Sequence, residues 1–163
     1  MTLADAAAQA DALAEEGKEQ ELAELRRQWD DEVEAAARSS DYRERVVAFR
    51  AIAQFRYRQK VELLARGLED ESPACRGSAL LALERLSRDH PSVVNGVRRT
   101  LHELATRDDN EAVRRLAIMA LRNGSPQPET IRILAALADD DDEQRELRDA
   151  AAKVAQALRR KGR

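Results

Sequence analysis

The chain has 163 residues, enough to bury one modest hydrophobic core. No apolar run approaches the ~18 residues that cross a bilayer, and the first residues lack the basic and apolar regions of a secretory signal. One cysteine excludes a disulfide framework, and one cysteine with two histidines is too few for a Cys/His metal cluster. We therefore expect a cytoplasmic protein with no metal or other cofactor and no membrane partner.

Charge is distributed unevenly along the chain, although the net charge is only −3. Residues 1–42 hold four basic and twelve acidic side chains, whereas residues 43–163 hold 24 basic and 19 acidic side chains. An acidic head of this kind does not favour nucleic acid as a partner for the whole chain. We expect an acidic N-terminal helical extension over residues 1–40 and a repeat domain over residues 41–163.

The extension is predicted to form two helices, over residues 2–16 and 18–38, with a break near Gly17. It either caps the end of a repeat array, which we favour, or docks as a helix on another protein. Residues 1–16 carry only two large apolar side chains, so we expect them to be mobile or loosely packed. The second helix has an apolar stripe made by Leu22, Leu25, Trp29 and Val33.

After the extension, the pattern Arg-x-x-Ala-x-x-(Ala/Val) recurs four times, at arginine-to-arginine spacings of 31, 38 and 34 residues. Small residues three positions apart form a narrow stripe on one helix face, so that neighbouring helices can approach closely. Each such helix is followed by a turn and a second helix with larger apolar residues at helical spacing. The four copies are Arg45, Ala48 and Ala51; Arg76, Ala79 and Ala82; Arg114, Ala117 and Ala120; and Arg148, Ala151 and Val154.

This alternation predicts A helices, which carry the arginine pattern, and B helices, which follow them. Turn residues such as Ser72-Pro73 and Asn123-Gly124 separate the helices, since they favour helix starts and helix ends. The last A helix has no B partner, and we expect its polar end, residues 159–163, to fray. The predicted helices are 42–54, 57–68, 73–87, 91–106, 110–122, 127–138 and 143–160.

In the last three copies an aspartate lies six residues before the arginine, as Asp70 with Arg76, Asp108 with Arg114 and Asp142 with Arg148. With this aspartate the unit resembles the HEAT repeat, particularly the short bacterial form found in phycobilisome-lyase-like proteins. The resemblance covers about residues 41–160 and implies an all-α fold, a right-handed α-solenoid (superhelix) of antiparallel helix pairs. It also implies that these six side chains form a ladder of hydrogen bonds and ion pairs between neighbouring repeats.

The same resemblance implies a concave face that is lined by B helices and open to a protein or peptide. We therefore expect a scaffold or adaptor for protein-protein interaction, not an enzyme. An accessory subunit of a lyase-like enzyme complex is a further alternative, by analogy with the same family. The candidate lining residues, chosen by the helices that carry them, are Arg56, Lys60, Arg98, Arg99, His102 and Arg132.

The segment 43–66 suggests a different function, because it combines seven basic residues with aromatic ones. Basic residues can bind phosphates and aromatic rings can stack on bases, so a nucleic-acid-binding solenoid is the main alternative. The segment can equally be a solvated basic face, or the surface on which the acidic residues of 18–38 pack, and we favour these two interpretations. The nucleic-acid alternative uses Arg50, Arg56, Arg58 and Lys60.

No catalytic or metal-binding arrangement stands out in the sequence. Cys75 lies on the small-residue stripe of its helix, where a buried small side chain is expected, and no histidine is close to it in sequence. His90 and His102 fit no Ser/His/Asp or metal-ligand spacing. The acidic run 139–143 lacks the Asp/Gly pattern of a calcium-binding loop, and a turn between repeats explains it better.

Overall fold

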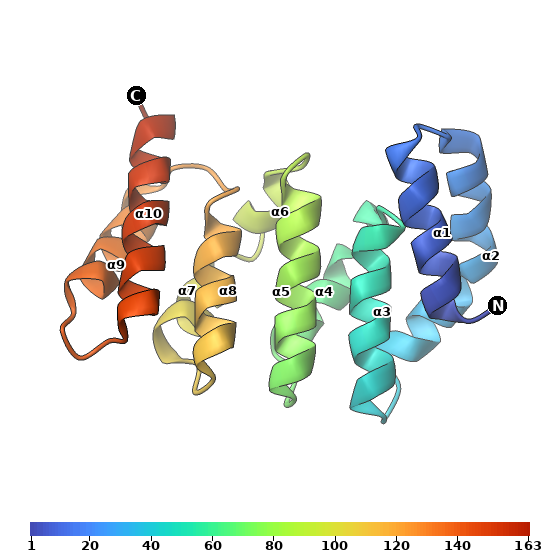
Figure 1. The fold of residues 1–163 in the computed structure, drawn as a ribbon, viewed down its shortest axis with the longest axis horizontal. Coiled ribbons are helices and arrows are strands. Elements are labelled where there is room, and N and C mark those ends of the chain that lie inside the picture. The colour runs from blue at the N-terminus through green and yellow to red at the C-terminus, as the bar shows by residue number, and fades with distance from the viewer. The chain divides into compact units, whose positions relative to one another are not determined.

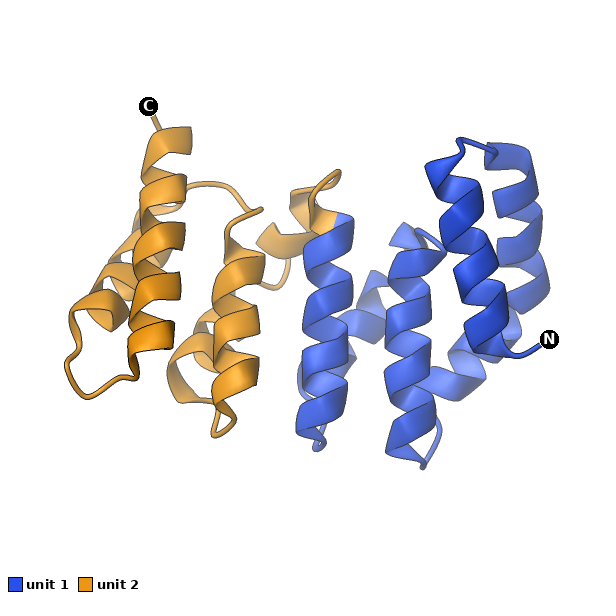
Figure 2. Ribbon diagram, in the orientation of Figure 1, with its two compact units in different colours: residues 1–86 blue, residues 87–163 orange.

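A computed structural model describes residues 1–163, which form ten α-helices and one short 3-10 helix, with no β-strand (Figure 1). The all-α class expected from the sequence is therefore confirmed. None of these helices is both long enough and apolar enough to cross a membrane. The chain divides into two compact units, unit 1 from Met1 to Leu86 and unit 2 from Ser87 to Arg163 (Figure 2).

Unit 1 is built on three helices that pack against one another, α1, α2 and α3, with α4 packed on α3. Its largest fully buried side chains include Leu22, Ile52, Phe55, Leu64 and Leu80. The elements are α1 (Leu3–Glu15), α2 (Glu19–Ala37), α3 (Tyr42–Gln54), the 3-10 helix η1 (Arg58–Lys60), α4 (Val61–Gly67) and α5 (Pro73–Ser87), whose last residue belongs to unit 2.

Unit 2 is centred on α8, which packs against α7 and α10, while α10 also packs against α9. Its largest fully buried side chains are Leu101, Ile118, Leu121, Leu134 and Leu147. The elements are α6 (Ser92–Asn95), α7 (Arg98–Arg107), α8 (Glu111–Leu121), α9 (Pro128–Asp139) and α10 (Arg145–Lys161).

The helix bounds agree with the sequence prediction where the apolar pattern is continuous. α3 and α5 have the predicted bounds. The prediction of one helix over 91–106 is wrong, because α6 ends before Gly96 and α7 begins only at Arg98. The predicted helix 57–68 begins as the 3-10 helix and becomes α4 at Val61.

The end of α3 explains this late start. Arg56 has a left-handed φ of 56°, and the amides of Arg56 and Tyr57 donate to the carbonyls of Ala53 and Ile52 at 3.0 and 2.9 Å. This Schellman arrangement usually places glycine at the left-handed position, as Gly17 with φ 72° does after α1. An arginine there costs about 1–3 kcal/mol, and its guanidinium offsets part of this by donating to the Ala53 carbonyl at 2.9 Å.

One segment that we expected to be mobile or loosely packed is a packed helix instead. In α1, Ala6, Ala7 and Ala10 are almost completely buried, so small side chains hold this helix against the core. At the other end, α10 continues to Lys161, whose Nζ donates to the Gly124 carbonyl at 3.2 Å. The expectation for residues 1–16 was wrong because it counted large apolar residues and overlooked close approach through alanine. The fraying of residues 159–163 stays a prediction, since all five residues are exposed and α10 ends at Lys161.

Small residues also bring α5 close to α3. The Cys75 Sγ lies 3.4 Å from the Tyr42 carbonyl oxygen, and the Ser78 hydroxyl donates to the Val46 carbonyl at 2.8 Å. A short side chain can reach the backbone of the next helix only where the two helices nearly touch. The A helices of unit 1 are therefore joined side by side through their small-residue faces.

Gly67, the last residue of α4, has no room for a side chain, since a Cβ there would lie 2.9 Å from both the Ala79 Cβ and the Phe49 Cζ. We expect Gly67→Ala to lower the free energy of unfolding by about 1–3 kcal/mol, because overpacking displaces these neighbours. Gly96→Ala is the matched control, since its Cβ would meet nothing closer than the Ser92 carbonyl oxygen at 3.5 Å. Urea unfolding measures both variants, and equal stabilities would contradict the packing argument.

Candidate binding surface

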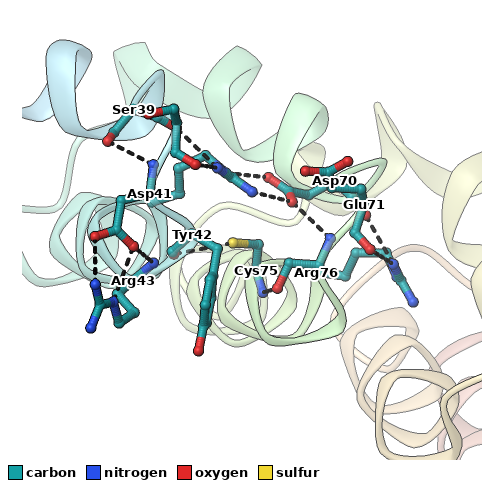
Figure 3. A network of polar contacts seen from close by, with 11 residues as sticks. Ser39, Asp41, Tyr42, Arg43, Asp70, Glu71, Cys75 and Arg76 are labelled. Atoms are coloured by element: carbon teal, nitrogen blue, oxygen red, sulfur yellow. Dashed lines mark hydrogen bonds and ion pairs between the residues drawn. The ribbon is translucent and has the colours of Figure 1, made fainter.

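The turns before the A helices of unit 1 carry a network of polar contacts (Figure 3). Arg45, on α3, donates from Nε and Nη2 to the two carboxylate oxygens of Asp70 at 2.9 and 3.0 Å. The two side chains are only 12 % and 10 % exposed. Arg45 also donates to the carbonyls of Ser39 and Ser40 at 2.9 and 3.2 Å. Its hydrogen bonds to Asp70, above all, raise the pKa of Arg45.

An aspartate oxygen accepts the amide two residues ahead in the turns before α5, α8 and α10, as Asp41 also does at the start of α3 with the Arg43 amide at 2.9 Å. Such Asx turns end one helix and start the next without leaving backbone donors unsatisfied. The pairs are Asp70 with the Ser72 amide at 2.9 Å, Asp108 with the Asn110 amide at 2.9 Å, and Asp140 with the Asp142 amide at 3.0 Å. The third turn therefore uses Asp140, two residues earlier than the sequence pattern suggested.

In unit 2 the equivalent ion pair has a different acid from the one expected. Arg114, on α8, donates to the two carboxylate oxygens of Glu143 at 2.8 and 2.7 Å, and the two side chains are 11 % and 18 % exposed. Asp142, the residue assigned to the ladder, is exposed. The acidic partner of Arg114 is therefore corrected from Asp142 to Glu143. The Asx turn that Asp140 forms ends at Asp142, and the next residue, Glu143, reaches Arg114 of α8.

Arg76 and Arg148 also contact the turn that precedes their own helix. Arg76 donates to the carbonyls of Asp70 and Glu71 at 2.9 and 3.2 Å, six and five residues back, as Arg45 does in its own turn. Arg148 lies 3.6 Å from Asp141, whose side chain is 98 % exposed, so water screens this pair. A ladder that is continuous through all repeats stays a prediction.

The basic segment 43–66 meets acidic side chains of the N-terminal extension. Lys60 is buried, and its Nζ lies 2.8 Å from both Asp30 and Glu34 of α2 and 5.3 Å from the centre of the Tyr57 ring. Burial alone would lower the pKa of Lys60, but its hydrogen bonds to the two carboxylates outweigh burial and raise it. The same contact lowers the pKa of Glu34.

A second cluster joins α1 to the same segment. Asp11 accepts hydrogen bonds from Arg56 at 2.8 Å and from Arg85 of α5 at 2.9 Å. Glu15 lies 3.6 and 3.2 Å from the same two arginines. These contacts agree with the interpretation in which acidic residues of the extension pack on the basic segment, and they extend it from α2 to α1.

In unit 2, two residues of the predicted face meet at one buried hydroxyl. Arg98 Nη1 donates to Thr130 Oγ1 at 2.8 Å, and His102 Nε2 lies 2.8 Å from the same oxygen. Because this hydroxyl accepts from Arg98, its own proton is available to a neutral His102. Burial lowers the pKa of His102, which favours that neutral form.

The predicted binding face is therefore divided between two roles. Arg56, Lys60, Arg98 and His102 make the contacts within the fold that are given above. The residues that reach the surface are Arg50, Arg58, Arg99 and Arg132. The side chain of Arg99 is 95 % exposed.

A seam lies in unit 1 between α2 and the η1–α4 segment. Lys60 of η1 contacts Asp30 and Glu34 of α2 across it. We call it the α2–α4 seam. A hollow of about 460 Å³ lies at one end and another of about 230 Å³ at the other. The first is lined by Ala23, Arg26, Arg27, Asp30, Tyr57 and Gln59. The second is lined by Ala37, Arg38, Arg45, Phe49, Leu63, Arg66, Gly67 and Asp70.

Sequence reasoning missed the arginines that α2 contributes to these hollows. It treated the face opposite the apolar stripe as acidic, although Arg26 and Arg27 form a basic pair within the helix and Arg38 follows its last residue. The adjacent arginines Arg26 and Arg27 were the sequence signal from which a basic position on this helix could have been predicted. The hollows themselves depend on how α2, packed on α3, lies beside the η1–α4 segment, which no local pattern specifies.

The residues weighed for catalysis or metal binding occupy structural positions. Cys75 is completely buried, and burial raises the pKa of its thiol. His90 lies in the turn before α6. No group of three or more His, Cys, Asp or Glu side chains is placed to hold a metal ion. The run 139–143 forms the end of α9 and the turn before α10.

No protein-family model matches the chain. No curated protein matches it either. The contacts of the chain itself are therefore the basis on which a function can be argued.

We expect Asp70→Asn to destabilise the protein by about 1–3 kcal/mol, because it leaves the Arg45 guanidinium without a carboxylate. Glu69→Gln is the control, since Glu69 is the exposed neighbour, and its effect should stay within about 0.5 kcal/mol. Denaturant unfolding at neutral pH measures both variants. Equal stabilities would show that the pair contributes nothing to the fold.

The same pair makes stability depend on pH. Burial raises the pKa of Asp70, but the bonds from Arg45 and from the Ser72 amide outweigh burial and lower it. A carboxyl whose folded pKa lies below its unfolded pKa stabilises fully above about pH 4 and loses this contribution as the pH falls through the folded pKa. The deficit of Asp70→Asn relative to wild type should therefore shrink in acid. A deficit that stays constant down to about pH 2 would contradict this assignment.

Proposed function

We propose that this chain is a non-catalytic adaptor of HEAT-like repeats that binds an acidic segment of another protein along the α2–α4 seam. The observation that carries the proposal is the pair of arginine-lined hollows at the two ends of the seam. The proposal includes the right-handed α-solenoid of antiparallel helix pairs expected of such repeats. It also includes a cytoplasmic location, in keeping with a single buried cysteine.

The HEAT-like interpretation is supported by contacts that recur at equivalent positions within each unit. An arginine of one A helix donates to both carboxylate oxygens of an acidic residue in the turn before the next A helix. Arg45 donates to Asp70 in this way, and Arg114 donates to Glu143. The Asx turn before the following helix recurs with these pairs. Stacked helix pairs that share one contact pattern are the construction of repeat proteins, which present extended surfaces to partners.

Charge favours an acidic occupant of the seam. Of the carboxylates that line the hollows, Asp30 pairs with Lys60 and Asp70 pairs with Arg45. Arg27 and Arg66, one at each hollow, are exposed to solvent. An incoming carboxylate would therefore meet guanidinium groups with little competition from the lining acids.

The dimensions of the seam favour a short extended segment. The two hollows are lined by α2 residues from Ala23 to Ala37, a separation of about 21 Å along a helix axis. Six or seven residues of extended chain span that distance. The proposed occupant is therefore a peptide of about this length with acidic residues near both ends.

A nucleic-acid-binding solenoid is the second candidate, and the exposed side chains of Arg50 and Arg58 favour it. It has less support, because Arg56 and Lys60 are paired with carboxylates of α1 and α2. An accessory role in a lyase-like enzyme complex rests on the family resemblance alone.

Selection of a random peptide library displayed on phage against the intact chain tests the adaptor function. We expect the enriched peptides to be acidic and to lose at least about tenfold in affinity for both Arg27→Glu and Arg66→Glu, since each change repels a carboxylate. Arg50→Glu is the matched control, because it makes the same charge change at an exposed position of α3 outside both hollows. Peptides that bind all three variants equally, or a selection without specific binders, would contradict the proposal.

The nucleic-acid candidate is tested by fluorescence anisotropy with short DNA and RNA. We expect no saturable binding at low salt, where phosphate contacts are strongest. Binding that weakens with added salt and with Arg50→Glu and Arg58→Glu would instead support the nucleic-acid candidate.

A further inference from the structure

Arg26 lies in unit 1 beside the larger of the two hollows, and its side chain is anchored. Its Nε donates to the carbonyl of Phe55, the C-cap residue of α3, at 2.6 Å. The backbone carbonyl of Arg26 accepts from the Tyr57 hydroxyl, so the residue is attached at two points. A guanidinium that is anchored in this way loses less conformational freedom when it binds a ligand.

Most donors of this guanidinium remain available. The bond to Phe55 uses one of its five N–H groups, and the four on Nη1 and Nη2 make no hydrogen bond or ion pair within the chain. No nitrogen of Arg26 is buried without a partner, so both Nη atoms reach solvent. Since Arg26 lines the hollow of about 460 Å³, its two Nη atoms can present a fork to a carboxylate there.

Two other residues of the same hollow offer acceptors. Lys60 contacts Asp30 at Oδ1, so Oδ2 can accept from another donor. The side chain of Gln59 is exposed and makes no hydrogen bond within the chain. One hollow therefore holds donors for a carboxylate and acceptors for an amide N–H. The last residue of a peptide carries both groups on one Cα.

Charge on α2 favours a segment that ends in this hollow. From the start of α2 to Leu25, the exposed side chains are Glu19, Gln20, Glu21 and Glu24. A segment that comes from the smaller hollow and continues past the larger one along α2 would meet these carboxylates, which repel an acidic chain. A segment that ends in the larger hollow avoids them.

We infer that the larger hollow binds the C-terminal carboxylate of the partner segment, and that Arg26 is the residue that recognises it. The inference rests on the proposed function and adds the identity of one acidic group, which is the chain terminus itself. The hollow of about 460 Å³ lies within the roughly 300–1,000 Å³ of pockets that enclose small ligands, whereas the hollow of about 230 Å³ does not. The larger one therefore has room for a terminal residue as well as for its carboxylate.

Two synthetic libraries of random heptapeptides test the inference, one with free C-terminal carboxylates and one with C-terminal amides. Each is selected against the intact chain, and matched acid and amide forms of the enriched peptides are compared by isothermal titration calorimetry. We expect each acid to bind at least about tenfold more tightly than its amide, because the amide has no charge for Arg26 to balance. Peptides with a blocked terminus should still bind through side-chain carboxylates, but more weakly.

The ratio of acid to amide affinity separates the role of Arg26 from general charge. We expect Arg26→Gln to reduce this ratio to about one, since the fork is lost. Arg27→Gln is the matched control: it removes an equal charge from the adjacent, exposed side chain of the same hollow, weakens both forms alike and leaves the ratio unchanged. Arg26→Lys keeps the charge but not the fork and should give an intermediate ratio, which provides a second measurement if Arg26→Gln does not fold.

Each contrary outcome has a different meaning. Amides that bind the wild-type chain as tightly as acids would overturn the inference and leave the adaptor function standing. A preference for acids that survives both Arg26→Gln and Arg26→Lys would show that Arg26 does not recognise the terminus. A failure of both libraries to yield binders would overturn the adaptor function, and the inference with it.

Discussion

A nearly buried arginine has to lie beside a carboxylate, and the turns between the A helices of this chain are built around that constraint. Arg45 holds both oxygens of Asp70, and the aspartate must sit in a turn tight enough to reach back to the preceding A helix. The Asx turn that positions Asp70 also starts α5, so one carboxylate determines where a helix begins and which helix it lies against. Alanine, serine and cysteine on the facing surfaces then allow the two helices to approach.

Much of this arrangement could be predicted from local pattern. The arginine-alanine spacing located α3 and α5 with their observed bounds, because small-residue stripes and turn residues act within a few positions of the chain. Features that depend on a neighbouring helix were missed. Glu143 replaced Asp142 as the partner of Arg114 because the last Asx turn begins at Asp140, and an acidic run offers no local signal to choose among its members. The hollows beside α2 likewise require the packed helices.

The uneven charge of the sequence has a structural explanation in unit 1. The acidic side chains of α1 and α2 lie on the basic segment that follows them, where Asp11 joins Arg56 to Arg85 and Asp30 contacts Lys60. A basic segment read alone suggests a phosphate-binding surface, whereas the same segment within unit 1 is partly a docking surface for its own N-terminal helices. The charges that remain exposed, such as Arg27 and Arg66, are the ones available to a partner.

The ion pairs of α1 also bear on the order in which the chain folds. The pairs of Arg45 with Asp70 and of Arg114 with Glu143 close loops of 25 and 29 residues, whereas the bond between Arg85 and Asp11 closes one of 74 residues. Loop-closure entropy makes the longer closure about 1 kcal/mol more costly. By this measure the two nearby pairs are easier to close than the bond between Arg85 and Asp11, although α1 also packs on α2, its neighbour in sequence.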